Sequence, residues 1–255
     1  MRFLTSTLTV LLFLGLWLGN GTIARATHIM GGQLTYVNVG TNQYVATLYL
    51  YRDCSGSTLP PNMTLIVKNG CNGIQQGSYP MNPVPNSIAT GTQYCAAQQQ
   101  QANCATGTLP NYETQQYRTG TITINPGQWL LSTETCCRPS TANLVGQANF
   151  RYEAALNNQI TLANGQQVTI QNSSAQYSAQ DIPVPFVPVS QSTTIGFNTT
   201  DPDNTRLNPD QDSLAYALTE PLSGCAVPVP YKPYPLAGPM PHPTIPGCSI
   251  LPPPN

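Results

Sequence analysis

The chain has 255 residues, and nine basic and ten acidic side chains leave it with a formal net charge of −1. Charged residues make up only 7% of the sequence, and the basic ones form no cluster that would attract a phosphate backbone. This composition argues against a nucleic-acid partner, and the length is sufficient for one large or two small hydrophobic cores.

Residues 1–26 are predicted to be a cleaved secretory signal peptide. Arg2 precedes an apolar run from Val10 to Leu18, and a small-x-small cleavage site ends at Ala26. The apolar run is too short to cross a bilayer comfortably, and no later stretch is apolar enough. We therefore expect an extracellular or cell-surface protein without a transmembrane segment.

Gly32–Cys54 is predicted to form a long antiparallel hairpin that turns at residues 40–42. Apolar and polar residues alternate along both arms, which is the period-two pattern of strands buried on one face. On the second arm, the residues expected to face the core are Tyr44, Ala46, Leu48 and Leu50. Cys54 follows in the same phase, so its thiol is expected at the edge of the core.

Further strands are expected after this hairpin. Met63–Lys68 is a short strand, whereas Asn69–Asn111 is irregular and is expected to need a disulfide to hold it. Alternation returns in Thr119–Ile124, Trp129–Cys137 and Gln147–Leu156. No apolar stripe with a 3.6-residue period is present, so the pattern predicts an all-β, antiparallel sandwich.

The last third of the chain changes in composition. Asn157–Asn172 is predicted to be a hairpin that turns at residues 163–165, and Thr193–Asn198 and Ser213–Thr219 are predicted strands. From Ala226 onward, eleven of thirty residues are proline. Such a segment cannot form a packed core alone and favours extended polyproline conformation.

All eight cysteines lie after the predicted signal peptide, which favours disulfides in an oxidising compartment. Zinc is disfavoured, because no C-x-x-C pair is present and the only histidines are His28 and His242. Strand phase predicts Cys54–Cys137 as a core bridge and assigns Cys136 to Cys71, although a β-bulge before Cys136 would exchange the roles of the adjacent pair. The two local bridges expected are Cys95–Cys104 and Cys225–Cys248.

An acidic loop is the one cluster that suggests a metal. Asp201, Asp203, Asp210 and Asp212 are four of the ten acidic residues and lie within twelve positions. Carboxylates this close repel one another unless a cation or solvent separates them, and Ca²⁺ prefers such oxygen ligands. The alternative is a solvated turn in which these side chains bond the backbone, since the spacing matches no complete calcium-loop template.

Several motifs recur in a known order: THIMGGQLTY…YVATLYLYRDC, TCCR at Thr135–Arg138, NSS at Asn172–Ser174, and DPD…DSLAYAL at Asp201–Leu218. In these motifs the chain resembles the N-terminal region of large secreted surface proteins of gliding Bacteroidota, described as PKD-like or gliding-motility-associated. The resemblance implies immunoglobulin-like β-sandwiches. It also implies a longer protein, so the chain is expected to be a truncated product.

With the resemblance, the chain is expected to divide into four parts: a signal peptide over 1–26, an immunoglobulin-like β-sandwich over 27–160, a partial cadherin-like β domain over 161–225, and a proline-rich tail over 226–255. The open alternatives for 161–225 are strands that join the first domain and strands completed by another chain.

No motif of a hydrolase, metalloprotease or nucleotide-binding enzyme is present, so no catalytic residue is predicted. The expected function is a non-enzymatic extracellular or cell-surface module for adhesion or motility, with a surface protein or polysaccharide as its partner. No cofactor is expected apart from the Ca²⁺ discussed above. The alternative is a secreted carbohydrate-active enzyme or its accessory carbohydrate-binding domain.

Overall fold

A computed structural model describes residues 29–91, 94, 96–139, 144–177, 199–203, 214–217 and 219–232. The predicted signal peptide, Cys95, Cys248, Asp210 and Asp212 lie outside these ranges. The main strands are β1 (Ile29–Gly40), β2 (Gln43–Asp53), β3 (Met63–Lys68), β4 (Gln75–Pro83), β5 (Ala89–Thr90), β6 (Tyr112–Arg118), β7 (Ile122–Thr123), β8 (Gln128–Thr135) and β9 (Phe150–Asn157). The remaining elements are one turn of 3-10 helix (Ala96–Gln98) and the short strands β10 (Gln159–Thr161), β11 (Gln167–Thr169), β12 (Gln176–Tyr177), β13 (Thr199–Thr200), β14 (Leu222–Gly224) and β15 (Val227–Pro228).

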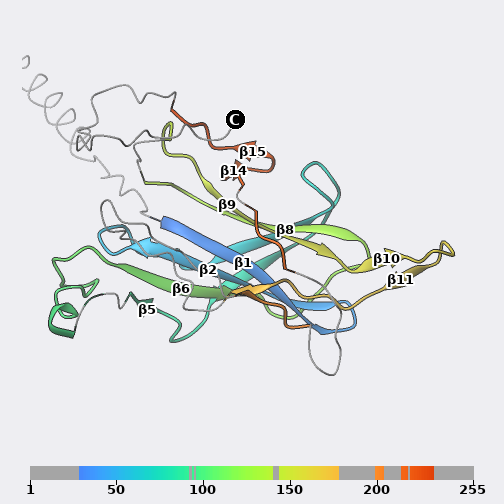
Figure 1. Cartoon of the computed structure of the whole chain (residues 1–255), viewed down its shortest axis with the longest axis horizontal. Coiled ribbons are helices and arrows are strands. Elements are labelled where there is room, and N and C mark those ends of the chain that lie inside the picture. Colours follow the sequence, from blue (N-terminus) through green and yellow to red (C-terminus); the bar gives the residue numbers. More distant parts are fainter. Residues whose placement is uncertain are drawn as a thin grey trace, which may run out of the picture.

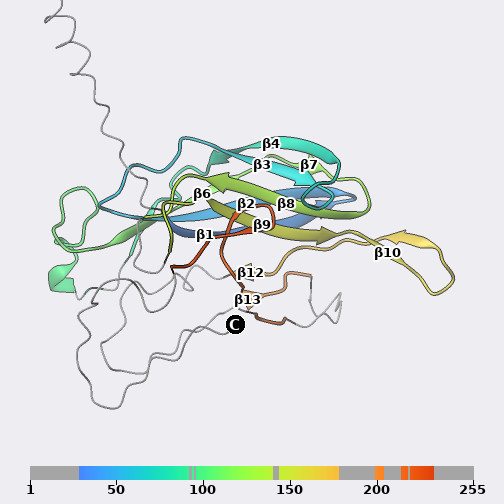
Figure 2. The ribbon, with the colours of Figure 1, turned by 90° about the horizontal axis from the view of Figure 1, so that it is seen from above.

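Strands β1 to β9 form one antiparallel sheet in the order β1-β2-β6-β4-β3-β8-β9, with β5 beside β6 and β7 beside β2. Strand β4 connects two layers: its residues up to Met81 pair with β3, and Asn82 and Pro83 pair with β6. The sheet therefore folds over and encloses its core between two layers (Figures 1 and 2). The predicted all-β, antiparallel class is confirmed, whereas the immunoglobulin-like assignment stays a prediction.

The predicted hairpin is present as β1 and β2, which pair from Ile29 to Gly40 and turn at Thr41 and Asn42. Its inner face supplies a large part of the core, because period two places alternate side chains on one side of the sheet. The buried cluster comprises Ile29, Leu34, Tyr36, Tyr44, Ala46, Leu48, Leu50, Met63, Leu65, Val67, Met81, Tyr117, Ile122, Ile124, Leu131, Phe150, Tyr152 and Leu156.

Within the sandwich, two strands longer than two residues were missing from the prediction, β4 and β6. The segment expected to be irregular contains β4, which was missed because Gly77 and Pro80 are unusual in strands. Proline is tolerated at position 80 because, on the edge away from β3, β4 pairs with β6 only at Asn82 and Pro83. The central strand β6 was missed because its glutamines and Glu113 interrupt the alternation of apolar and polar residues. Its Tyr117 is fully buried and donates to the carbonyl of Pro60 at 2.6 Å; burial first, and the charge of Glu113 second, raise the pKa of Tyr117 to about 12.

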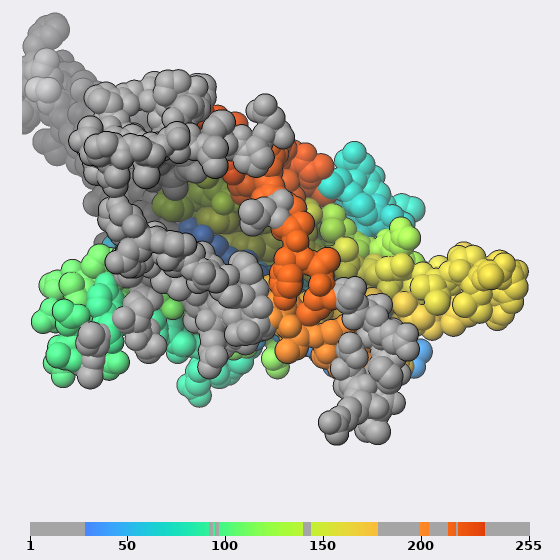
Figure 3. Space-filling view, viewed as in Figure 1, coloured from blue at the N-terminus to red at the C-terminus, as the bar shows by residue number. Residues whose placement is uncertain are grey.

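Farther along the chain, the predicted strand Gln147–Leu156 is present as β9, and the predicted hairpin Asn157–Asn172 is present as β10 and β11. This hairpin extends beyond the sandwich, as its yellow ribbon and atoms show (Figures 1 and 3). The predicted strand Ser213–Thr219 is wrong where it is described: residues 214–217 and Thr219 are exposed and form no strand. Thr193–Asn198 lies outside the described residues.

Segments after residue 170 contact the sandwich. The serines of the NSS motif bond the edge of β1, and the carbonyl of Leu222 accepts a hydrogen bond from Arg138 at 3.1 Å. The orange and red atoms of these segments lie across the sandwich surface in Figure 3. The division into domains over 27–160 and 161–225 stays a prediction, because residues 178–198 and 204–213 are not described.

Candidate functional site

A groove of about 440 Å³ opens on the outer face of the layer that contains β3, β8 and β9. Strands β3 and β8 pair only at Ile66–Lys68 with Leu130–Ser132. The same register would place Thr64 opposite Glu134, but no pair forms there, and the groove is lined by both of these residues. The hollow therefore arises where two neighbouring strands separate.

The groove is lined largely by the outward-facing side chains of these strands. Because side chains alternate along a strand, residues two apart share its solvent face. The lining residues are Asn62, Met63, Thr64, Ile66, Lys68, Cys71, Ser132, Thr133, Glu134, Arg151 and Cys225. Hydroxyl, amide, ammonium and carboxylate groups thus surround one hollow, which suits a polar ligand that both donates and accepts hydrogen bonds.

Arg151 organises the charges beside the groove. Its Nη1 lies 2.5 Å from Oε1 of Glu134, the residue directly opposite it on β8, and its Nε bonds Glu153 two residues along β9. The arginine side chain is only 8% exposed, so the three groups form a semi-buried, hydrogen-bonded network. Among the described residues the ion pairs are those of Arg52 and Arg151, and Lys68 belongs to neither.

A disulfide closes one wall of this groove. Cys71 and Cys225 are bonded, with 5.4 Å between their Cα atoms, and both line the hollow. This bond attaches the turn between β14 and β15 to the loop after β3, across 154 residues of sequence. It corrects two predictions, because Cys71 was expected to pair with Cys136 and Cys225 with Cys248.

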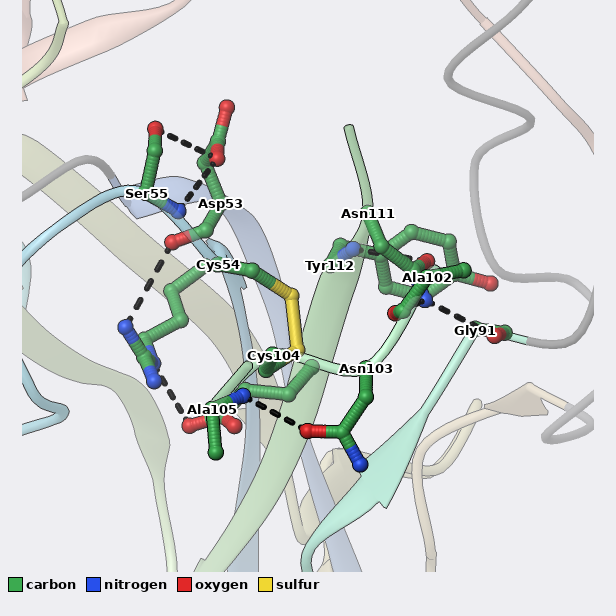
Figure 4. The surroundings of a disulfide bond; sticks show 12 residues. Asp53, Cys54, Ser55, Gly91, Ala102, Asn103, Cys104, Ala105, Asn111 and Tyr112 are labelled. Atoms are coloured by element: carbon green, nitrogen blue, oxygen red, sulfur yellow. Dashed lines mark hydrogen bonds and ion pairs between the residues drawn. A yellow bond between two sulfur atoms is a disulfide. The ribbon is translucent and has the colours of Figure 1, made fainter. Parts of the chain in front are cut away.

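The predicted core bridge is also corrected. Cys54 bonds Cys104, not Cys137, and this pair replaces the predicted Cys95–Cys104 bridge (Figure 4). Strand phase was misleading because β2 ends at Asp53, so Cys54 is already in a loop. The adjacent residues Cys136 and Cys137 are bonded to each other. The partners of Cys95 and Cys248 stay open, since both lie outside the described residues.

Polar side chains hold the two loops around the Cys54–Cys104 bond (Figure 4). The buried Asn111 side chain donates to the carbonyls of Gly91 and Ala102 at 3.1 and 2.6 Å, and the Asp53 carboxylate accepts both hydrogen bonds from Ser55. The Asn111 bonds satisfy loop carbonyls, including that of the buried Ala102, whereas the Asp53–Ser55 bonds lie at the surface. Asp53 and Cys54 of the YRDC motif therefore have a structural role, because they hold the loop that contains the disulfide.

Arg52 of the same motif is buried. Its Nε lies 2.5 Å from Oε1 of Glu113 on β6, and its Nη1 donates to the carbonyls of Gly56 and Ser57 at 3.0 and 3.2 Å. One guanidinium thus bonds a neighbouring strand and the loop that follows Cys54. This arrangement uses the fork of donors that distinguishes arginine from lysine.

The acidic loop is placed only in part. The Asp203 carboxylate accepts hydrogen bonds from the main-chain N–H and the hydroxyl of Ser173, and Oδ1 of Asp201 accepts the N–H of Asp203 at 2.9 Å. The hydroxyl of Ser173 in turn accepts the N–H of Asn38 at 3.0 Å. The DPD and NSS motifs are therefore connected, and together they bond the edge of β1.

The four aspartates predicted to hold calcium are not gathered within the described residues, since only Asp201 and Asp203 are placed. In that part of the chain, no group of three or more His, Cys, Asp or Glu side chains is arranged to hold a metal ion. The calcium site and its alternative, a solvated turn, both stay predictions.

Replacing Asp203 by asparagine separates the two readings. In EDTA, Asp203→Asn is expected to cost about 1–3 kcal/mol, because the amide accepts with one oxygen only and leaves a donor of Ser173 unpaired. If calcium binds here, millimolar Ca²⁺ raises the melting temperature of the wild type and not that of Asp203→Asn. Thermal melts of both proteins, with Glu220→Gln as an exposed control, make the measurement. If calcium does not change the melting temperature of the wild type, the calcium site is excluded and the solvated turn is the remaining interpretation.

Sequence reasoning identified some groove residues singly and missed the groove itself. The alternation in Gln147–Leu156 places Arg151 and Glu153 on the outward face of their strand, but nothing in the sequence shows that Glu134 and Glu153 meet at Arg151. The alternation in Met63–Lys68 already places Thr64 and Lys68 outward. No sequence signal shows that β3 and β8 separate, because that depends on how the layers pack.

No known family model matches the sequence, and no similar protein is found among curated proteins or solved structures. The resemblance to gliding-motility-associated surface proteins therefore stays a prediction that rests on its motifs. The described part of the chain contains no helix with the length and hydropathy needed to cross a bilayer.

Proposed function

We propose that the protein is a non-enzymatic extracellular or cell-surface binding module, and that the groove between β3 and β8 holds its ligand. The observation that carries this proposal is the groove itself: an open hollow lined mostly by polar side chains, together with Met63 and Ile66, and closed on one side by the Cys71–Cys225 disulfide. A disulfide-closed wall and a network of ion pairs keep the binding groups in place before a ligand arrives, which lowers the entropic cost of binding.

A polysaccharide is the partner that this chemistry favours. Sugar hydroxyls donate and accept hydrogen bonds, which matches the ammonium of Lys68, the hydroxyls of Thr64 and Ser132, and the carboxylate of Glu134. No aromatic ring is among the described residues that line the groove. Hydrogen bonds would therefore supply the affinity, and the binding is expected to be weak for one site and stronger for repeated copies on a surface.

The enzymatic alternative has less support from this groove. Glu134 and Glu153 are its neighbouring carboxylates, and both have oxygens bonded to Arg151. A glycosidase instead needs one carboxyl group free to give a proton to the leaving oxygen. The arrangement here is that of a fixed charge network.

The test is retention of the exported protein on immobilised xylan, pectin and chitin. Thr64 is exposed, faces the groove and tolerates a β-forming residue, so Thr64→Tyr is expected to fill the hollow and weaken retention at least tenfold. Thr161→Tyr, at an exposed strand position that does not line the groove, is the matched control.

Two outcomes contradict the proposal. Equal retention of Thr64→Tyr and wild type would place the ligand elsewhere. Release of reducing sugar from any of the three polysaccharides, lost in Thr64→Tyr, would make the protein an enzyme.

A further inference from the structure

The two end strands of the sheet, β1 and β9, lie side by side without pairing. They occupy opposite ends of the strand order, and Figure 2 shows them next to each other after the sheet has folded over. The hydroxyl of Tyr36 on β1 donates to the carbonyl of Ala155 on β9 at 2.8 Å. No ladder forms between these two described strands, so neither edge has a strand partner among the described residues.

The outward peptide groups of β1 are identified by the serines of the NSS motif. The N–H of Tyr36 donates to the hydroxyl of Ser174 at 2.8 Å, and the N–H of Ser174 donates back to the carbonyl of Tyr36 at 3.0 Å. Because peptide groups alternate in direction along a strand, those of Gly32 and Leu34 also point away from β2. Neither has a hydrogen-bond partner among the described residues on that side.

The same alternation assigns the edge of β9. Where β8 and β9 begin to pair, the N–H of Asn158 donates to the carbonyl of Gly127 at 3.2 Å. The main-chain N–H and C=O groups of residues an even number of positions from Asn158 therefore point toward β8. Those of Arg151, Glu153 and Ala155 point away from it. The Ala155 carbonyl bonded by the Tyr36 hydroxyl agrees with this direction.

A cavity of about 380 Å³ lies at these two edges. Its lining includes Gly31, Gly32, Tyr152 and Glu153, and residues 219–222 cover one side. A Cβ atom added at Gly31 would meet nothing within 4 Å, so the glycine leaves this space open. Tyr152 is 7% exposed, and its hydroxyl lacks a hydrogen-bond partner in the described structure.

Two arginines line this cavity: Arg151, which is paired with Glu134 and Glu153, and Arg138, which has no ion-pair partner among the described residues. The Arg138 guanidinium lies 3.9 Å from the centre of the Phe150 ring, and two of its nitrogens donate to the carbonyls of Asn149 and Leu222. Burial lowers the pKa of Arg138 and raises that of Tyr152. Arg138 also lines the cavity, and guanidinium N–H groups can bond carbonyl oxygens such as those of an extended peptide.

We propose that this cavity accepts an extended segment of a partner protein, which pairs with the outward peptide groups of Gly32 on β1 and Glu153 on β9, both of which line the cavity. A peptide in strand conformation presents the alternating N–H and C=O groups that these edges lack, and strand addition of this kind gives affinity through main-chain hydrogen bonds. The serines of the NSS motif already bond the β1 edge at Tyr36 and Asn38, so the segment would continue an existing row. This site shares Arg151 with the groove between β3 and β8, but β1 and residues 219–222 line only the cavity.

The probe is a phage-displayed library of random linear seven-residue peptides, selected on the wild-type protein. Gly31→Tyr fills open space at the cavity with a residue that favours strands, and its φ requires no glycine, so the fold is expected to persist. Selected peptides are expected to bind Gly31→Tyr at least tenfold more weakly than wild type. Gly120→Tyr is the matched control, because a Cβ added at Gly120 also meets nothing within 4 Å.

A backbone-modified peptide tests the pairing itself. Methylating alternate amide nitrogens of a selected peptide removes the donors that a strand would give to β1, and binding is expected to fall at least tenfold for one of the two alternations. The proposal is overturned if no peptide is enriched, if Gly31→Tyr binds as well as wild type, or if both methylated peptides keep full affinity. Retention of xylan, lost in Gly31→Tyr, without peptide binding would make the cavity a carbohydrate site instead. Thr64→Tyr is expected to leave peptide binding unchanged, which separates this test from that of the groove.

Discussion

Replacing Arg52 by alanine is expected to destabilise the protein by about 3–5 kcal/mol, the largest effect of any single substitution considered, because it leaves the Glu113 carboxylate buried without its partner. The Arg52 and Glu113 side chains are only 11% and 15% exposed. The same change removes the donor that holds the carbonyls of Gly56 and Ser57, so the loop beside Cys54 also loses its bonds. Urea unfolding followed by the fluorescence of Trp129 measures the loss.

Two further variants separate the charge from the general effect of losing an arginine. Arg118→Ala removes an exposed arginine at the end of β6 and is expected to cost less than about 1 kcal/mol. Arg52→Ala combined with Glu113→Ala is expected to cost less than the sum of the single changes, because no charge is then left unpaired. Strict additivity would mean that the two side chains do not interact.

Removing the Cys71–Cys225 disulfide is the second change with a large expected effect. In the chain-entropy model a loop of 154 residues corresponds to about 5 kcal/mol, and distortion of either state brings the measured range to about 2–5 kcal/mol. Cys71→Ala and Cys225→Ala are made together, so that no free thiol remains to exchange. The double variant is also expected to bind polysaccharide more weakly, because it loses one wall of the groove.

The Cys54–Cys104 pair is the internal comparison. It spans 50 residues, and the logarithmic dependence on loop length predicts that its loss costs about 1 kcal/mol less than that of Cys71–Cys225. Peptide mapping without reduction should link the same partners, 54 with 104 and 71 with 225. A double variant of Cys71 and Cys225 as stable as the wild type would contradict this connection between the C-terminal segment and the sandwich.

The two-layer fold and the groove both arise because a single sheet folds over on itself. Folding one sheet into two layers encloses the core, and it also leaves β3 and β8 partly separated and β1 and β9 unpaired at the ends of the strand order. Protein edges of this kind are normally covered, because unpaired strands attract other strands. Here the serines of the NSS motif cover part of the β1 edge, and the outward peptide group of Gly32 has no hydrogen-bond partner among the described residues.

Local sequence was sufficient to predict the all-β class, the hairpin of β1 and β2, the inward face of β2, the strand β9, and the hairpin of β10 and β11. In β1, β2 and β9 the core residues alternate along the strand, so the pattern is local, whereas the largely exposed hairpin of β10 and β11 is indicated by its turn residues. The prediction failed at β4 and β6. Strand β6 lies between neighbours on both sides, so main-chain hydrogen bonds and two buried tyrosines hold it although most of its residues are polar.

The disulfide pairs and the groove could not be read from the sequence, because both depend on contacts between residues far apart in the chain. Cys54 is in phase with the core strand but lies past its end, and Cys71 meets Cys225 only because the C-terminal segment returns to the sandwich. Glu134 and Glu153 look isolated along the sequence, yet β8 and β9 pair in a register that brings both to Arg151. Residue types and their alternation follow from local sequence, whereas register and layer packing are decided by the tertiary structure, since they arise from the collective burial of the core.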